Sequence, residues 1–287
     1  MLCIKNGRIH DAVHREPYTA DILIENGKLL QIGTDLHAEQ TIDAAGLEIY
    51  PGFVDAHSHI GLDGYGEPGV DINERNDICC PQLRAIDGVN PMDESFVYAR
   101  SAGITCVCTG PGSANVLGGT FTAIKTAGTR IDDMIVKKEA AMKCAFGENP
   151  KRCYASKCDS SRMTTAAILR EALMKARLYL QKKEAAGDDV FRQPAFDMKL
   201  EALIPVLRGQ IPLKAHAHRA DDILTALLIA KEFDVDITLD HVTEGHLIVN
   251  HLVQAGKPVL VGPSFGSKSK QELKEKSFAT AGVLDNA

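Results

Sequence analysis

The sequence predicts an α/β fold in which helices cover a parallel sheet. Beyond about residue 50, apolar runs of strand length alternate with helical stretches, which is the pattern of βαβ units. Continued around, such units form either an open sheet or a closed (β/α)8 barrel. The 287 residues are 45% hydrophobic and 24% charged, which is typical of a globular protein with a sizeable core.

The first 50 residues have a different texture, with short strands separated by turns. Asn6-Gly7 and Asn26-Gly27 are typical hairpin dipeptides, and strand-like runs such as Leu2–Ile4 and Asp21–Ile24 precede them. A meander of this size does not stand alone. We therefore expect residues 1–50 to pack against another set of strands, and residues 51–287 to form the larger domain.

Elements of the second part follow from apolar runs and from helical spacing. The predicted strands are Phe53–His59, Ile104–Cys108, Ala140–Gly147, Ile211–His218, Val235–His241 and Pro258–Gly262. The predicted helices are Thr164–Lys183, Asp221–Phe233, Glu244–Ala255 and Lys268–Ala281. The glycine-rich segment Gly110–Gly119 lacks the ending of a phosphate-binding loop, so we expect a tight turn whose backbone lines a pocket.

Composition argues against several functional classes. A net charge of −6 without any block of Lys and Arg argues against a nucleic-acid surface. The longest strongly apolar stretch, Ile223–Ala230, is far shorter than the ~20 residues of a membrane span. The N-terminus has no long apolar segment that would indicate export. The eight cysteines show no CxxC spacing, so we expect reduced thiols in a cytoplasmic protein.

Five of the ten histidines stand at the predicted ends of three strands. His57 and His59 project from one face of a strand, about 7 Å apart. His216 and His218 repeat this arrangement, and His241 ends a third strand. Sites in parallel sheets lie at the carboxyl ends of the strands, and neutral imidazoles bind metal ions. The pattern therefore favours a metal site over the alternative of surface histidines in loops.

Two segments resemble a known family. Asp43-Ala44-Ala45-Gly46, followed by Pro51-Gly52-Phe53-Val54-Asp55-Ala56-His57-Ser58-His59, is similar to the start of the barrel in the amidohydrolase superfamily, and most similar to its imidazolonepropionase-related members. The resemblance implies a TIM-type (β/α)8 barrel with a small N-terminal β-sandwich part formed by residues 1–50. It also implies metal-dependent hydrolysis of an amide or another C–N bond.

The resemblance implies a set of metal ligands. His57 and His59 correspond to first-strand ligands of the more buried metal, and His216 and His241 to fifth- and sixth-strand ligands of the second. The bridging anion of this superfamily is a glutamate or a carboxylated lysine. We favour Glu148, which lies just past the predicted strand Ala140–Gly147, at its carboxyl end. Lys143 is the alternative, and it would need to be buried, neutral and carboxylated.

Four further residues are candidates for substrate contact. His218 lies two residues past His216 on the same face, where it touches substrate or supports a ligand. Arg219, Lys151 and Arg152 follow the predicted strand ends, where cations can clamp a carboxylate or phosphate of a substrate. Their alternative role is that of solvated surface charges.

The catalytic residue is not identified by the sequence. The family's proton-transferring group is an aspartate at the end of the eighth strand. About seven strands are counted from Phe53, and Asp285 follows no apolar run, so we do not assign it this role. We therefore expect a barrel that lacks its last strand or strands.

The histidine pattern and the resemblance together imply a hydrolase that cleaves a C–N bond with a metal-activated water and one or two divalent ions. Imidazole and carboxylate ligands suit Zn²⁺, with Fe, Mn and Ni as the alternatives. The expected partner is a small-molecule substrate such as a cyclic amide, an N-acyl amino acid or a dipeptide, and association into a homo-oligomer is compatible with the sequence. The alternatives are a catalytically inactive scaffold or fragment and a mononuclear deaminase-type member.

Overall fold

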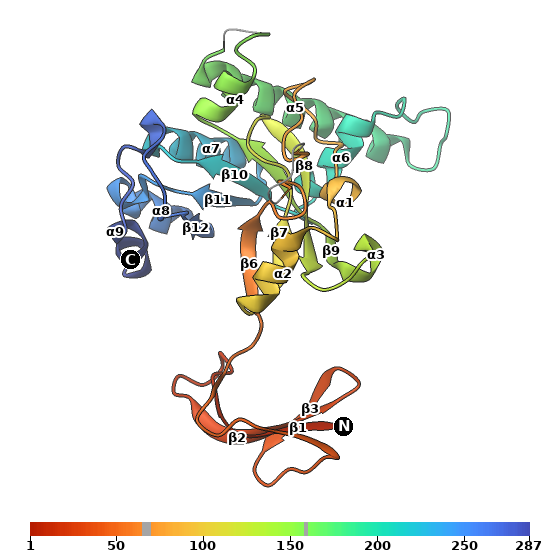
Figure 1. Ribbon diagram of the computed structural model, residues 1–287. Coiled ribbons are helices and arrows are strands. Elements are labelled where there is room, and N and C mark those ends of the chain that lie inside the picture. The colour runs from red at the N-terminus through yellow and green to blue at the C-terminus, as the bar shows by residue number, and fades with distance from the viewer. Residues whose placement is uncertain (65–69, 158–159) are drawn as a thin grey trace. The chain divides into compact units, whose positions relative to one another are not determined.

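The chain folds into two compact units, Met1–Phe53 and Val54–Ala287. The computed structural model describes residues 1–64, 70–157 and 160–287 (Figure 1). This division falls close to the predicted boundary after residue 50.

The smaller unit is a single twisted sheet. Its strands are β1 (Leu2–Ile9), β2 (Tyr18–Glu25), β3 (Lys28–Gly33), β4 (Gln40–Asp43) and β5 (Glu48–Ile49). The order is β3-β2-β1-β4, with β5 also paired to β1. The predicted hairpin turn at Asn26-Gly27 joins β2 to β3, and both residues have positive φ, as such turns require. Ile9, Ala20 and Ile22 form a small core, while Leu29 and Leu30 are exposed.

The larger unit contains a sheet of seven strands in the part of the chain that the structure describes. They are β6 (Phe53–Ser58), β7 (Ile104–Thr109), β8 (Leu117–Lys125), β9 (Ile135–Ala145), β10 (Leu213–Ala217), β11 (Ile237–His241) and β12 (Val259–Val261). Their order is β12-β11-β10-β9-β8-β7-β6, and β9 through β12 pair in parallel. The sheet is curled so that side chains of β6 and β11 meet inside it: His57 Nδ1 lies 3.0 Å from Asp240 Oδ2. The α/β, TIM-type fold that the sequence predicts is therefore confirmed, as a nearly closed barrel of seven strands within the described residues.

One strand departs from the prediction of a purely parallel sheet. Leu117–Lys125, of which the first residues were predicted as part of a turn, forms β8 and runs antiparallel to both β7 and β9. The chain therefore returns through the sheet itself rather than through a crossover helix. Gly119, at φ +106°, packs against the carbonyl of Leu83, where a Cβ atom would lie only 2.3 Å away. Glycine is thus required at this position.

Helices cover the outer face of the sheet. They are α1 (Ala85–Gly88), α2 (Glu94–Ser101), α3 (Ile131–Met134), α4 (Glu148–Cys153), α5 (Arg162–Ala186), α6 (Met198–Leu207), α7 (Ala220–Phe233), α8 (Val249–Ala255) and α9 (Ala279–Asp285), with 3-10 turns η1 (Gly245–Leu247) and η2 (Gln271–Leu273). The main core lies between α5, α6 and α7 and the strands β9, β10 and β11 (Figure 1). This core fixes which side of each strand faces the helices.

Two helix predictions fail in part. Glu244–Ala255 is split into η1 and α8, and Lys268–Ala281 is not one helix but the short elements η2 and α9. The polar run Lys268–Lys276 contains Leu273 as its single large apolar residue, too few to bury a long helix against the barrel. Helices α2 and α6 were not predicted.

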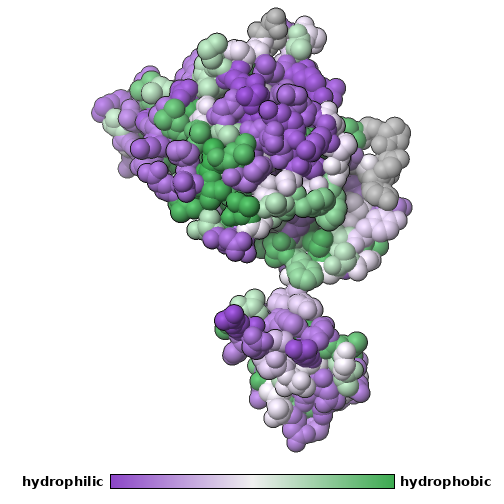
Figure 2. Space-filling view, turned by 90° about the vertical axis from the view of Figure 1, so that its left-hand side faces the viewer, coloured by the Kyte–Doolittle hydropathy of each residue, from purple (hydrophilic) through white to green (hydrophobic). Residues whose placement is uncertain are grey.

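The described residues can be compared with the expectations of no membrane span and of reduced cysteines. No described helix is long and apolar enough to cross a membrane. The face of the larger unit shown in Figure 2 carries a band of hydrophobic side chains among hydrophilic ones. The cysteines among the described residues are free thiols.

Candidate metal centre

Three strand ends bring five histidines together. His57 lies in β6 and His59 directly after it, His216 lies in β10 with His218 directly after it, and His241 ends β11. The rings of these residues lie next to one another, so the three strands present them at the same end of the barrel, where sites of parallel sheets form. The five predicted histidines therefore belong to one region of the structure.

Regular alternation delivers His216. Leu213 and Ala215 belong to the core between the sheet and the helices. Successive side chains of a strand point to opposite faces, so Lys214 and His216 point into the barrel. Both side chains are buried.

His241 reaches the same place by a different route. Ile237 and Leu239 face the helices, so alternation alone would turn His241 outward as well. The backbone instead adopts the left-handed region at His241 (φ +76°) and Val242 (φ +44°). This region is unfavourable for bulky side chains and is found where the surroundings hold it. The His241 ring donates from Nδ1 to the carbonyl oxygen of Gly262 at 2.6 Å, which fixes it on the inner side.

The five rings form a continuous group. The ring centroids of His57 lie 5.1 Å from those of both His59 and His241. The His241 centroid lies 4.5 Å from that of His216 and 4.7 Å from that of His218. One potential ligand atom of each of His216, His218 and His241 lies within 4.8 Å of the others. This spacing suits ligands that surround a single ion.

Hydrogen bonds orient the rings. Three rings use Nδ1 for a hydrogen bond, which leaves Nε2 for another partner. The contacts are His59 Nδ1 to Gly110 O at 2.7 Å, His241 Nδ1 to Gly262 O at 2.6 Å and His218 Nδ1 with Thr243 Oγ1 at 2.7 Å. His216 differs, because its Nε2 lies 3.3 Å from Asn149 Nδ2 and its Nδ1 has no partner.

Several buried polar atoms of this region have no hydrogen bond. They are Nε2 of His57, Nδ1 of His216 and Nζ of Lys143, whereas Nδ1 of His57 and Oδ2 of Asp240 face each other at 3.0 Å outside hydrogen-bond geometry. Buried polar atoms are nearly always paired, so a cluster of unpaired ones indicates a missing partner. A divalent cation would supply that partner to the imidazole nitrogens, so the residues present fit a metal ion.

Burial keeps the histidines neutral. It lowers the pKa of His59 to about 4 and that of His218 to about 3, with nearby lysine ammonium groups adding to the effect. The pKa values of His57, His216 and His241 are also lowered, again chiefly by burial. Neutral imidazole is the form that binds metal ions, so no proton has to be displaced near pH 7.

A charged cluster lies in the barrel interior beside the histidines. The Asp240 carboxylate accepts a hydrogen bond from Lys214 Nζ at 2.8 Å, and its other oxygen lies 3.7 Å from Lys143 Nζ. Both lysine nitrogens lie over the ring of Phe121, at 5.4 Å for Lys143 and 5.5 Å for Lys214. The ring also lies 5.6 Å from that of His57. Phe121 therefore fills the interior where a solvated barrel would hold water.

Titration inside this cluster follows from burial and charge. Burial lowers the pKa of Lys143, which is completely buried, to about 8, although the Asp240 carboxylate opposes the shift. Burial alone would raise the pKa of Asp240, but His57 and the two lysines outweigh it and hold the pKa below its ordinary value. The neutral amine of Lys143 is thus accessible near neutral pH.

Three interior residues were not predicted as part of the site: Lys214, Asp240 and Phe121. The signal for two of them was available: Lys214 stands two residues before His216, and Asp240 belongs to the polar face of the alternating run Val235–His241. Both therefore had to point into the barrel. Phe121 gave no such signal, because its strand was not predicted.

Glu148, favoured as the bridging ligand, is engaged elsewhere. Its Oε1 accepts a hydrogen bond from the backbone N–H of Glu272 at 3.2 Å, and its own N–H donates to Glu272 Oε2 at 2.8 Å. This reciprocal clasp holds η2 against the start of α4. Glu148 is also not a member of the histidine group whose ligand atoms lie within 4.8 Å of one another. Lys143, the alternative, is completely buried in the barrel interior.

The predicted substrate-contacting cations lie at the periphery. Arg219 forms a bidentate ion pair with the exposed carboxylate of Asp221, in which Nε donates to Oδ1 at 3.0 Å and Nη2 donates to Oδ2 at 2.8 Å. Lys151 and Arg152 lie in α4, shortly after Asn149, which contacts His216. Contact of these residues with a substrate stays a prediction.

A cavity of about 540 Å³ opens beside the histidines. It lies between β6 on one side and β11 and β12 on the other, and its lining residues are Asp55, Ala56, His57, His59, Asp240, His241, Leu260, Val261, Gly262 and Pro263. Its volume suits a small molecule.

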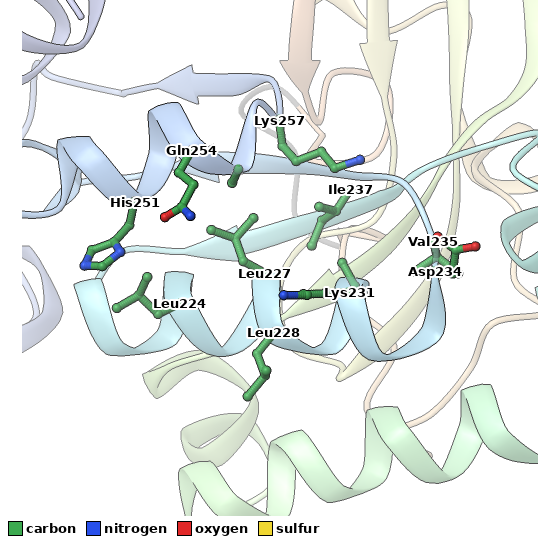
Figure 3. A pocket seen from close by; sticks show the side chains of 12 residues that line it. Leu224, Leu227, Leu228, Lys231, Asp234, Val235, Ile237, His251, Gln254 and Lys257 are labelled. Atoms are coloured by element: carbon green, nitrogen blue, oxygen red, sulfur yellow. The ribbon is translucent and has the colours of Figure 1, made fainter.

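A second cavity, of about 650 Å³, lies apart from the histidine group. Figure 3 shows it between α7 and α8, where Leu224, Leu227 and Ile237 meet the side chains of Lys231 and Lys257. Its lining contains His251 but none of the five histidines at the strand ends. This groove on the outer layer offers no group of metal ligands.

Comparison with known proteins gives a similar structure that covers the whole chain. No family model matches the chain. The crystal structure of an amidohydrolase from Thermotoga maritima superposes with a TM-score of 0.95 at 39% identity, covering 100% of this chain and 76% of that one. Its similarity therefore extends over both sequence and fold.

Curated relatives are more distant. Amidohydrolase tasK of Hapsidospora irregularis is 29% identical over 263 residues, which is 80% of this chain and 27% of the relative. A dihydroorotase of Elusimicrobium minutum is 28% identical over 213 residues, which is 64% of this chain and 48% of the relative. The chain thus spans about a quarter to a half of the length of these curated relatives.

Proposed function

This chain belongs to the amidohydrolase superfamily, and from that premise we propose that it is a metal-dependent hydrolase that cleaves the C–N bond of an amide or cyclic amide. The observation that carries the proposal is the group of five contiguous histidine rings, with unpaired ring nitrogens, at the carboxyl ends of three barrel strands. Surface histidines would not share a buried site, and their nitrogens would be solvated.

We assign His57, His59, His216 and His241 as ligands of one or two divalent ions. Zn²⁺ is the ion that their chemistry suits best. A bound cation of this kind supplies an activated water at neutral pH and polarises the carbonyl group of the substrate. The finer relationship to imidazolonepropionase-related members stays a prediction.

For the bridging anion we replace Glu148 by Lys143. Lys143 is completely buried, points into the barrel and has a lowered pKa, so its neutral amine can add CO₂ and release a proton to form a carbamate. Glu148 would first have to leave its clasp with Glu272. The buried carbamate would carry the negative charge that two cations share.

The other residues of the chain position and enclose the site. The carbonyl groups of Gly110 and Gly262 orient His59 and His241, and Phe121 excludes water from the interior. His218, Arg219, Lys151 and Arg152 are proposed substrate contacts, and His218 also lies close enough to His216 and His241 to share an ion with them. We assign no proton-transferring carboxylate among the described residues.

One observation favours a second candidate, a mononuclear deaminase-type enzyme. Ligand atoms of His216, His218 and His241 already lie close enough together to hold one ion without Lys143 or Glu148. In that case the carbamate would be dispensable, and the reaction would release ammonia.

Metal content of the purified chain, measured by elemental mass spectrometry without chelator, tests these assignments. We expect about two equivalents in the wild type, loss of at least one in Lys143→Met and no loss in the matched control Glu148→Gln. A single equivalent that survives both substitutions would favour the mononuclear candidate. Absence of metal from a folded sample would overturn both and favour an inactive scaffold.

Activity is then measured on a panel of small molecules. A cyclic amide, an N-acyl amino acid and a dipeptide report hydrolysis, and ammonia release from an aminopurine reports deamination. Hydrolysis that depends on added Zn²⁺ and is lost in His241→Ala supports the proposal. Ammonia release alone would replace it by the second candidate.

A further inference from the structure

Asp240 is a carboxylate that lies between the interior lysines and the histidines. It is fully buried, and three nitrogens from three different strands surround it. Lys214 Nζ donates to Oδ1 at 2.8 Å, His57 Nδ1 lies 3.0 Å from Oδ2, and Lys143 Nζ lies 3.7 Å from Oδ2. Its two oxygens therefore have different partners: Oδ1 contacts Lys214, and Oδ2 faces His57 and Lys143.

Lys214 sets the orientation of the carboxylate. Lys214 and Asp240 lie on neighbouring parallel strands, where His216 is the register partner of Asp240. The ammonium group reaches Oδ1 and is itself held over the ring of Phe121. With Oδ1 engaged, Oδ2 is directed toward His57.

The neighbouring rings indicate what Oδ2 does. His59 and His241 each place Nδ1 against a backbone carbonyl oxygen, which can only accept a hydrogen bond. Those two rings therefore carry their proton on Nδ1 and leave the lone pair of Nε2 free. His57 has no carbonyl partner, and the group that lies against its Nδ1 is Oδ2 of Asp240.

We propose that Asp240 is a positioning residue that holds His57 in the tautomer protonated on Nδ1, so that Nε2 of His57 is free to bind a cation. The inference rests on the proposed function, since His57 needs a free Nε2 only if it is a ligand. Partners of this kind, behind a metal-binding histidine, fix its tautomer and its ring orientation.

A carboxylate rather than a carbonyl group is required at this point because of the lysines. Two buried ammonium groups without an anion would be strongly destabilising. One carboxylate between Lys143 and Lys214 serves both and still presents Oδ2 to His57. When Lys143 is carboxylated, Lys214 remains as the cation that holds Asp240.

The substitution Asp240→Asn tests the proposal. The amide oxygen of the new side chain has to accept from Lys214, so its NH₂ group faces His57 Nδ1 and forces the ring proton onto Nε2. The tautomer is read directly from two-bond ¹H–¹⁵N correlations of metal-free protein labelled with ¹⁵N-histidine. The His57 signals are assigned by their loss in His57→Gln.

We expect the Nδ1-protonated pattern for His57 in the wild type and the Nε2-protonated pattern in Asp240→Asn. Zn²⁺ titration of the same samples should show binding weakened by 10- to 100-fold in the variant. Thr238→Val is the matched control, because Thr238 lies on the same strand and its buried Oγ1 forms no hydrogen bond. It should leave the His57 tautomer and the Zn²⁺ affinity unchanged.

The wild type alone can overturn the inference, so the test does not depend on the folding of the variant. A His57 proton on Nε2 in folded, metal-free wild type would refute it, as would an unchanged tautomer in folded Asp240→Asn. The failure of the proposed function is a separate result: an absence of hydrolysis leaves the tautomer assignment intact, whereas a wrong tautomer leaves hydrolysis to be explained by other ligands.

Discussion

The neighbouring strands β10 and β11 deliver their histidines in opposite ways. They pair in parallel, with His216 opposite Asp240 and Ala217 opposite His241. In β10 regular alternation points His216 inward, whereas in β11 alternation points Asp240 inward and a left-handed backbone then turns His241 to the same side. At its carboxyl end β10 therefore supplies one inward polar residue, His216. Strand β11 supplies two, Asp240 and His241.

The comparison shows that the alternation of apolar and polar residues determines which face of a strand is buried. It does not determine the direction of the side chain at the last residue of the strand. Leu213 in β10 and Leu239 in β11 face the same core, and both are fully buried. The difference arises in the turn that follows β11, where the Val242 N–H donates to the carbonyl of Ala217 at 3.1 Å. A strained turn of this kind is stable because the packed strands on both sides hold it.

Truncation of the shared core face gives the largest expected effect. Leu213→Ala and Leu239→Ala should each lower the free energy of unfolding by roughly 2–5 kcal/mol, because each leaves a cavity at a fully buried position. Urea denaturation of the metal-free protein measures both. Leu228→Ala is the control, since this leucine is 52% exposed and its truncation should change stability little. A near-zero effect at Leu239 alone would show that β11 does not share the core of β10.

Acidification should destabilise the metal-free protein through the buried histidines at the ends of β6, β10 and β11. Folding lowers the pKa of His218 to about 3 and that of His59 to about 4, and the pKa values of His216 and His241 fall as well. Below the ordinary histidine value of about 6.5, the unfolded chain binds protons that the folded chain does not. Stability is therefore complete above about pH 6.5 and falls as the pH is lowered toward these folded-state values.

The expected loss between pH 6.5 and 5 is roughly 2 kcal/mol for each histidine that stays neutral. Denaturation at several pH values measures it, and His216→Asn and His241→Asn should reduce the loss by similar amounts. If only one substitution did so, the histidines of β10 and β11 would not be equally buried in solution.

The smallest effect concerns the residue that precedes each strand. Gly209, before β10, has φ +64°, and Asp234, before β11, has φ +49°. Asp234 is exposed and ends α7 in the left-handed conformation, where glycine is free of strain. Asp234→Gly should therefore raise the free energy of unfolding by about 0.5–1 kcal/mol, and Gly209→Ala should lower it by about 1 kcal/mol. Thermal unfolding measures both, and a loss of stability in Asp234→Gly would mean that the Asp234 side chain stabilises this turn.

Much of the candidate site could be predicted because it depends on local pattern. The spacing of His57 and His59, and of His216 and His218, places each pair at a strand end, and the structure brings all four together with His241. The choice between Glu148 and Lys143 could not be made from sequence. It depends on the partner of Glu148, which is Glu272, 124 positions away.

The fold was less predictable where a segment carries no clear period. Strands β6, β7, β10 and β11 were predicted within a few residues of their bounds, because apolar runs mark them. Strand β8 was missed because its sequence starts with Leu117-Gly118-Gly119 and reads as the end of a turn. Its glycines are explained only by the close approach of the Leu83 backbone, which is a contact in three dimensions.

The antiparallel course of β8 also has a consequence for how the barrel assembles. Strands β7, β8 and β9 pair with their immediate neighbours in sequence, so their contacts close short loops. The parallel pair of β9 and β10 instead joins residues such as Cys144 and Ala215, which are separated in the chain by helices α4, α5 and α6. Short loops form faster than long ones. We therefore expect the β7–β9 meander to fold first and to act as the template on which the histidine-bearing strands β10 and β11 are laid down.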